Sequence, residues 1–141
     1  MTELKIRYGH TGDVETVLRF WKSAAEGTDR HDSPQACLAL IERDPEALLL
    51  AEIDGLLVGT LIAGWDGWRA HLYRLAVHPG HRRRGIARAL IAQAEQRFRG
   101  FGAFRADAMV LHDNDLAHRA WAAAGYRRQP EWGRWVKPLA T

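Results

Sequence analysis

Cysteine is nearly absent from this chain, because Cys37 is the single one among 141 residues. One cysteine cannot form an internal disulfide, and it cannot complete a zinc knuckle or a Cys-x-x-Cys redox pair. No apolar run approaches the roughly 20 residues needed to span a bilayer. The N-terminal residues MTELKIRYGH also lack the apolar stretch of a signal peptide. These absences argue against a disulfide framework, a metal or redox centre and a membrane partner, and they predict a cytoplasmic protein.

Lysine is also scarce, since 17 of the 20 basic residues are arginine, in a chain of net charge +3. Arginine suits phosphate contacts better than lysine does, so a polyanionic ligand is indicated, with nucleic acid as one candidate. The chain is 47% hydrophobic and 26% charged, which fits a core of ordinary proportions. No repeat or linker divides it, and we therefore expect a single domain over residues 1–141.

Hydrophobic periodicity predicts seven strands and four helices. The predicted strands are residues 4–8, 47–53, 56–63, 69–77, 104–111, 126–129 and 134–137. The predicted helices are residues 13–26, 34–43, 85–99 and 114–124, the first two capped by Thr11 and Ser33. Asp54-Gly55 predicts a tight hairpin between the second and third strands. This order predicts an α/β domain with a mixed sheet and helices on both faces.

The most informative stretch is LYRLAVHPGHRRRGIARALIAQAE, residues 72–95. A strand ends at Val77, an arginine-rich loop follows, and a helix begins at Gly85. Unpaired backbone N–H groups at the start of a helix bind anions, and Gly85 lets the backbone approach a phosphate closely. The loop matches neither G-x-x-x-x-G-K-[ST] nor a G-x-G-x-x-G after the first strand, so a P-loop ATPase and a dinucleotide dehydrogenase fit poorly.

Two motifs in this half of the chain resemble those of a known family. Leu75-x-Val77-x-Pro79 followed by Arg82-x-x-Gly85-x-Ala87 is similar to the acetyl-CoA binding motif of the GNAT superfamily of N-acetyltransferases. Downstream, Asn114-x-x-Ala117-x-x-x-Trp121-x-x-x-Gly125-Tyr126 resembles the family's N-x-x-A-x-x-x-Y-x-x-x-G-[FY] segment. Because the predicted element order also agrees with the family's fold, the resemblance covers nearly the whole chain, which is similar to small single-domain bacterial members.

The resemblance implies the GNAT fold, a mostly antiparallel, splayed sheet, and direct acetyl transfer from acetyl-CoA to a primary amine. It implies that the fourth strand pairs with the pantetheine arm, that the following loop holds the pyrophosphate, and that a backbone N–H of this strand stabilises the oxyanion. The residues that it assigns to acetyl-CoA are Leu75, Ala76, Val77, Arg82, Arg83, Arg84, Gly85, Ile86, Ala87, Asn114 and Ala117.

The chain departs from the family pattern at Trp121, where many members have a tyrosine that protonates the departing thiolate. Indole N–H donates a hydrogen bond but is not a practical acid. A thiol of pKa about 8.5 is a tolerable leaving group without an acid. Trp121 therefore either supplies a hydrogen bond to the leaving group or packs beside the cofactor.

A candidate base lies on the fourth strand, whose A-H-L-x-x-L-A-V-H pattern is similar to that of arylalkylamine N-acetyltransferases. In those enzymes two histidines separated by one residue serve a proton relay; here His71 is the first, and Tyr73 replaces the second. Period-two alternation places both side chains on one face of the sheet. The alternative is that His71 only bonds to backbone or solvent at the entrance of the strand.

The acceptor is predicted to be a small-molecule amine, because the short chain has no added domain for a protein partner. Glu26, Asp29 and Asp32 would attract a cationic amine, or they are solvated acids of a loop. Glu52 is either a second candidate base or a surface residue. The alternatives to a small-molecule enzyme are a catalytically weak CoA-binding module and an acetyltransferase of protein or peptide amines. The cluster Arg82 to Arg84 is confined to one loop rather than spread along a stripe, which argues against nucleic acid, and a homodimer is left open.

Overall fold

The computed structural model describes residues 3–24 and 32–139. In chain order the elements are β1 (Leu4–Tyr8), the 3-10 helix η1 (Thr11–Asp13), α1 (Val14–Ala24), α2 (Pro34–Arg43), β2 (Leu48–Ile53), β3 (Leu56–Trp65), β4 (Ala70–Val77), the 3-10 helix η2 (Pro79–His81), α3 (Ile86–Gly100), β5 (Ala106–Ala108) and α4 (Asp115–Ala123). The strands form one sheet in the order β1-β2-β3-β4-β5. The first three pairings are antiparallel and β4–β5 is parallel, which confirms the predicted mixed sheet.

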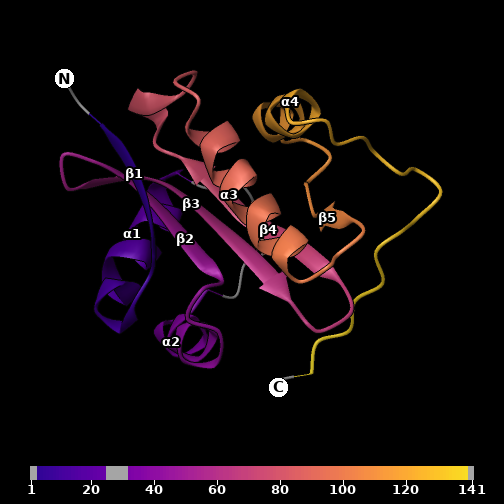
Figure 1. Cartoon of the computed structure of the whole chain (residues 1–141), viewed down its shortest axis with the longest axis horizontal. Coiled ribbons are helices and arrows are strands. Elements are labelled where there is room, and N and C mark those ends of the chain that lie inside the picture. The colour runs from indigo at the N-terminus through magenta and orange to yellow at the C-terminus, as the bar shows by residue number, and fades with distance from the viewer. Residues whose placement is uncertain (1–2, 25–31, 140–141) are drawn as a thin grey trace.

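Helices cover both faces of this sheet (Figure 1). Successive side chains of β2 point to opposite faces of the sheet. Leu48 and Leu50 lie in the core beneath α1 and α2, whereas Leu49 and Ala51 pack on the opposite side with α3. The strand therefore reads as a continuous apolar run, as a strand buried on both faces should. The sheet lies between two layers of helices, and β4 contributes to both cores, with Ala70 and Leu72 in one and Ala76 in the other.

A β-bulge interrupts β4 in its middle. Thr60 stands opposite Ala76 and Ile62 opposite Tyr73, so Leu61 alone faces the two residues Arg74 and Leu75. Arg74 has a φ of 58°, in the left-handed region that non-glycine residues seldom adopt. A bulge bends its strand and increases its twist. Beyond this point β4 and β5 are no longer paired, since their register covers only residues 70–72 and 106–108.

The C-terminal part of the sheet differs from the prediction. The strand predicted over residues 104–111 is reduced to Ala106–Ala108 because β4 diverges from it. The strands predicted over residues 126–129 and 134–137 are wrong: no strand is formed there. Gly125, with a φ of 93°, ends α4, and the Tyr126 N–H bonds to the Trp121 carbonyl at 3.0 Å, so Tyr126 belongs to the helix terminus. The following residues run along the outside of the molecule (Figure 1).

The start of the first helix is also corrected. Thr11 does not cap it but begins η1, and the N-cap position is His10, whose backbone N–H donates to the Asp13 carboxylate at 2.9 Å. Ser33 caps α2 as predicted, accepting from the Ala36 N–H at 3.1 Å. None of the helices within the described ranges has the length and apolar character needed to cross a membrane.

Candidate functional site

The free edge of β4 forms the centre of the candidate site. β5 stays with β4 as far as Leu72, whose carbonyl accepts from the Met109 N–H at 3.3 Å. In the described part of the chain, the stretch from Tyr73 to Val77 has β3 on one side and no strand on the other. Backbone N–H and C=O groups along such an edge are available to an extended ligand. The predicted splay between the fourth and fifth strands is thus present.

The arginine-rich loop lies at the end of this free edge. Gly85 has a φ of 78° and occupies the N-cap position of α3. The first hydrogen bond of the helix runs from the Ala89 N–H to the Gly85 carbonyl at 3.0 Å, so the N–H groups of Ile86 and Ala87 precede the helical ladder. Arg83 and Arg84 are exposed and Arg82 is half-buried. The first amides of α3, the positive end of its dipole and three arginines of the adjoining loop follow directly on one another along the chain, which is the chemistry of an anion site.

The second motif places its residues on α4, on the same side of the sheet as α3. Asn114 caps this helix by accepting from the Ala117 N–H at 3.0 Å, and Ala117 packs against the α3 core. Asn114 thus has a local structural role that accounts for its side-chain oxygen. The cofactor contacts predicted for Asn114 and Ala117 stay predictions.

Trp121 lies in the core between α3 and α4, with 5% of its surface exposed. Its ring packs edge-to-face against Tyr126 at 5.0 Å, and the Tyr126 hydroxyl donates to Glu95 at 2.8 Å. This environment favours the packing interpretation of Trp121. Its hydrogen bond to a leaving group stays a prediction.

His71 and Tyr73 lie on the α1–α2 face of β4, as the alternation predicted. The His71 Nε2 is 3.5 Å from an Asp66 carboxylate oxygen, an orienting partner at the β3–β4 turn that the sequence analysis did not identify. Burial raises the pKa of the Tyr73 phenol, so the phenol stays neutral at physiological pH. Gly64 makes room for this ring, because a Cβ there would lie 3.3 Å from the Tyr73 hydroxyl.

The predicted acidic acceptor cluster is only partly described. Glu26 and Asp29 lie outside the described residues. Asp32 is paired with Arg74, whose Nε donates to the Asp32 Oδ1 at 3.1 Å. The charge of Asp32 is therefore already compensated by an arginine, which weakens its attraction for a cationic amine.

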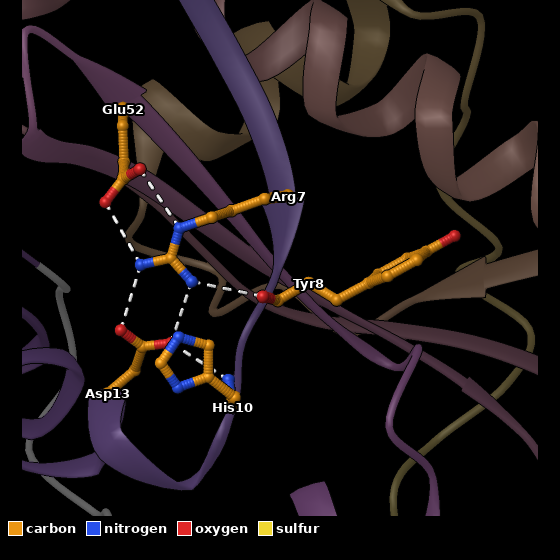
Figure 2. Close-up of polar contacts among 5 residues, drawn as sticks. All are labelled: Arg7, Tyr8, His10, Asp13 and Glu52. Carbon is orange, nitrogen blue, oxygen red and sulfur yellow. Dashed lines mark hydrogen bonds and ion pairs between the residues drawn. The ribbon is translucent and has the colours of Figure 1, made fainter.

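Glu52, on β2, is held in an ion-pair cluster with Arg7 and Asp13 (Figure 2), and β3 separates its strand from β4. Arg7 lies between two carboxylates, with its Nε 3.0 Å from Glu52 and its Nη1 2.8 Å from Asp13. These hydrogen bonds raise the pKa of Arg7, and its guanidinium lowers the pKa of Asp13 to about 2. The surface interpretation of Glu52 fits this arrangement, and Glu52 is not free to act as a base.

The Asp13 pKa predicts a dependence of stability on pH. Because the folded pKa is about 2 and the ordinary value is 3.8, the stabilisation is complete above about pH 4 and is lost as the pH falls towards 2. We expect the thermal midpoint of the wild type to fall more steeply between pH 5 and pH 2 than that of Asp13→Asn. Glu15→Gln, at a carboxylate whose side chain is 90% exposed, is the control and should follow the wild type. Parallel curves for Asp13→Asn and wild type would contradict this expectation.

Comparison with known proteins gives consistent matches. The model of the "Acetyltransferase (GNAT) family" matches residues 14–126. An acetyltransferase of Yersinia pestis (strain Pestoides F) is 32% identical over 126 residues, 89% of each chain. An acetyltransferase of Pectobacterium atrosepticum is 35% identical over 112 residues, 79% of each chain.

Solved structures share the fold at lower identity. The PaiA N-acetyltransferase of Thermoplasma acidophilum, solved with coenzyme A, superimposes with a TM-score of 0.80 at 18% identity, covering 90% of this chain and 91% of that one. The aminoglycoside acetyltransferase AAC(6')-Iy, in complex with a bisubstrate analogue, has a TM-score of 0.77 at 20% identity, covering 97% and 99%.

Proposed function

From the premise that the chain belongs to the acetyltransferase (GNAT) family, we propose that it transfers an acetyl group from acetyl-CoA directly to a primary amine of a small-molecule acceptor. Family membership carries the acetyl-transfer activity, and the acceptor class and the roles of individual residues are the proposed part. The observation that carries the proposal is the free edge of β4 from Tyr73 to Val77, which leads directly to the arginine-rich loop before α3.

The residues present fit acetyl-CoA, which supplies the activated acetyl group as a thioester. The free backbone groups of Leu75 and Val77 suit the amides of a pantetheine arm, which pair as a strand would. The loop from Arg82 to Ala87 suits a pyrophosphate, since it combines guanidinium groups with the first amides of α3. The polar backbone of β4 and the positive charge of the loop therefore follow one another in the same order as the pantetheine arm and the pyrophosphate of acetyl-CoA.

The chain's own groups account for the transfer in three parts. Binding on the β4 edge orients the reactants, which lowers the entropic part of the barrier. A backbone N–H of β4 stabilises the oxyanion of the tetrahedral intermediate. His71, oriented by Asp66, removes the proton from the attacking amine, and Tyr73 on the same face extends the proton path. Because Trp121 stands at the tyrosine position of the motif and is buried, the CoA thiolate departs without being protonated by a tyrosine.

The experiment that tests this function is a calorimetric titration with acetyl-CoA, followed by a thiol-release screen over amines. The panel contains polyamines, aminoglycosides, arylalkylamines, amino acids and peptides with free N-termini. Micromolar binding with CoA release for a small amine is expected. Release only with peptides would replace the proposed acceptor class, and binding without release for any amine would favour a CoA-binding module. No binding would overturn the proposal.

His71→Ala is expected to reduce turnover about 100-fold at pH 7, and much less at pH 9. An alkylamine of pKa about 10.4 is almost entirely protonated at pH 7, and a larger free fraction at pH 9 makes a base less necessary. The measurement is kcat/KM against pH for wild type, His71→Ala and Tyr73→Phe, the last of which keeps the ring but removes the phenolic proton. An equal loss at both pH values in His71→Ala would assign His71 a packing role instead.

A further inference from the structure

Thr60, on β3, has 0% of its surface exposed, and no other polar or charged residue in the described ranges is buried. Its hydroxyl accepts a hydrogen bond from the Trp21 Nε1 of α1 at 2.8 Å and donates one to the Arg74 carbonyl of β4 at 2.9 Å. A single hydroxyl thus connects a helix to the bulge of the neighbouring strand. Burial strengthens such a chain of hydrogen bonds, because no water competes for its groups.

Trp21 determines which groups donate and which accept in these two hydrogen bonds. An indole N–H can only donate, so the Thr60 oxygen must accept from Trp21 and keep its one proton for another acceptor. The Arg74 carbonyl is the acceptor that receives this proton. Trp21, which is 5% exposed, thereby fixes the rotation of the Thr60 hydroxyl.

Arg74 is held at its side chain as well as at its carbonyl. Its guanidinium pairs with Asp32 and lies 5.6 Å from the centre of the Trp21 ring. A residue with φ of 58° needs surrounding contacts that compensate for its backbone conformation. Trp21, Thr60 and Asp32 provide these contacts from one side of the sheet.

Fixing the Arg74 carbonyl also fixes the next amide of the chain. The peptide bond is planar and trans, so the Leu75 N–H points in the direction opposite to the Arg74 carbonyl. Since that carbonyl is bonded to Thr60, the Leu75 N–H points away from Thr60. Leu75 belongs to the part of β4 that β5 does not accompany.

We propose that Thr60 and Trp21 are positioning residues for acetyl transfer, which hold the Arg74–Leu75 peptide so that the Leu75 N–H is directed at the reacting carbonyl oxygen. This inference rests on the proposed function, because it assigns the oxyanion-stabilising N–H of β4 to Leu75. It also assigns a role to the bulge. The bulge rotates the Arg74–Leu75 peptide of β4 out of the hydrogen-bond ladder with β3, and the buried Thr60 hydroxyl holds the peptide in that orientation.

The test compares Thr60→Val, which keeps the shape but loses the hydroxyl, with Thr60→Ser, which keeps the hydroxyl. For Thr60→Val we expect kcat to fall about 100-fold, since misplacement of one group by about 1 Å has an effect of this size. The KM for acetyl-CoA should change less than about twofold, and Thr60→Ser should recover most of the lost kcat. Trp21→Phe should give an intermediate loss. Leu48→Ala, in the same core as Trp21, should lower the thermal midpoint but not kcat.

A second measurement does not depend on activity. Residue-resolved amide hydrogen exchange of the free protein should be faster at Arg74 and Ala76, the neighbours of Leu75, in Thr60→Val, relative to amides of α3, and unchanged in Thr60→Ser and Leu48→Ala. Unchanged exchange in Thr60→Val, or a wild-type kcat, would overturn the positioning role while the proposed function stands. If the wild type releases no CoA with any amine, the proposed function fails, and exchange alone then decides whether Thr60 holds this peptide.

Discussion

Gly85→Glu is expected to weaken acetyl-CoA binding by at least about 100-fold, which corresponds to about 2.7 kcal/mol. A carboxylate at this position would occupy the start of α3 and neutralise the arginines of the loop, so both the helix amides and the guanidinium groups would lose their anionic ligand. Within residues 3–24 and 32–139, a Cβ at Gly85 meets nothing within 4 Å, so this part of the chain leaves room for the side chain. Calorimetric titration with acetyl-CoA measures the effect.

Gly102→Glu is the matched control for this variant. Gly102 has a φ of 81°, close to the 78° of Gly85, so both variants carry the same backbone penalty of about 1–2 kcal/mol. An added Cβ at Gly102 also has no neighbour within 4 Å in the described part of the chain. It follows the opposite end of α3, about 22 Å away along a helix of 15 residues. Gly102→Glu should lower the thermal midpoint as Gly85→Glu does, yet bind acetyl-CoA normally. Equal binding by both variants would remove the loop from the cofactor site.

Asp44→Ala is expected to destabilise the fold by about 3 kcal/mol, through the arginine that it leaves behind. The Arg97 side chain is 10% exposed, its Nη2 donates to Asp44 at 2.6 Å, and its Nε is buried without a hydrogen-bond partner among the described residues. Glu46, at 3.8 Å and 60% exposed, compensates the charge only weakly. The thermal midpoint should fall by about 10 °C.

The double variant Asp44→Ala/Arg97→Leu separates the buried charge from the loss of the ion pair itself. Replacing both partners by apolar groups is often nearly neutral, so the double variant should be more stable than Asp44→Ala alone. Arg97 also lies 5.0 Å from the Phe101 ring, and the leucine keeps part of that packing. A double variant less stable than Asp44→Ala would show that the guanidinium contributes through packing rather than through its charge.

Elements with local signals could be predicted from the sequence. Ser33 and Asn114 cap α2 and α4, and Gly85 begins α3, because a cap depends on residues within one turn of each other. Asp54-Gly55 likewise determines its hairpin locally. The binding loop was therefore accessible to sequence analysis, together with its place between β4 and α3.

Features that depend on distant residues could not be predicted. Arg74 pairs with Asp32 across 42 positions, and Arg7 pairs with Glu52 across 45, and no periodicity encodes such partners. The bulge at Arg74 contains no glycine or asparagine, the residues from which a positive φ could be predicted. The strands predicted over residues 126–129 and 134–137 were wrong for a related reason, since a strand forms only where its backbone pairs with another strand, and a local apolar pattern does not encode that partner.

The connection between β4 and β5 also bears on how the chain folds. β2, β3 and β4 are joined by turns of two and four residues, which close rapidly, whereas the parallel pairing of β4 with β5 must wait until residues 78–105 have formed their crossover. In non-local pairings of this kind the entropic cost of closing the loop comes before the stabilising contacts are made, so the pairings form late. The arginine-rich loop begins that crossover, and we therefore expect the anion site to be completed among the last events of folding.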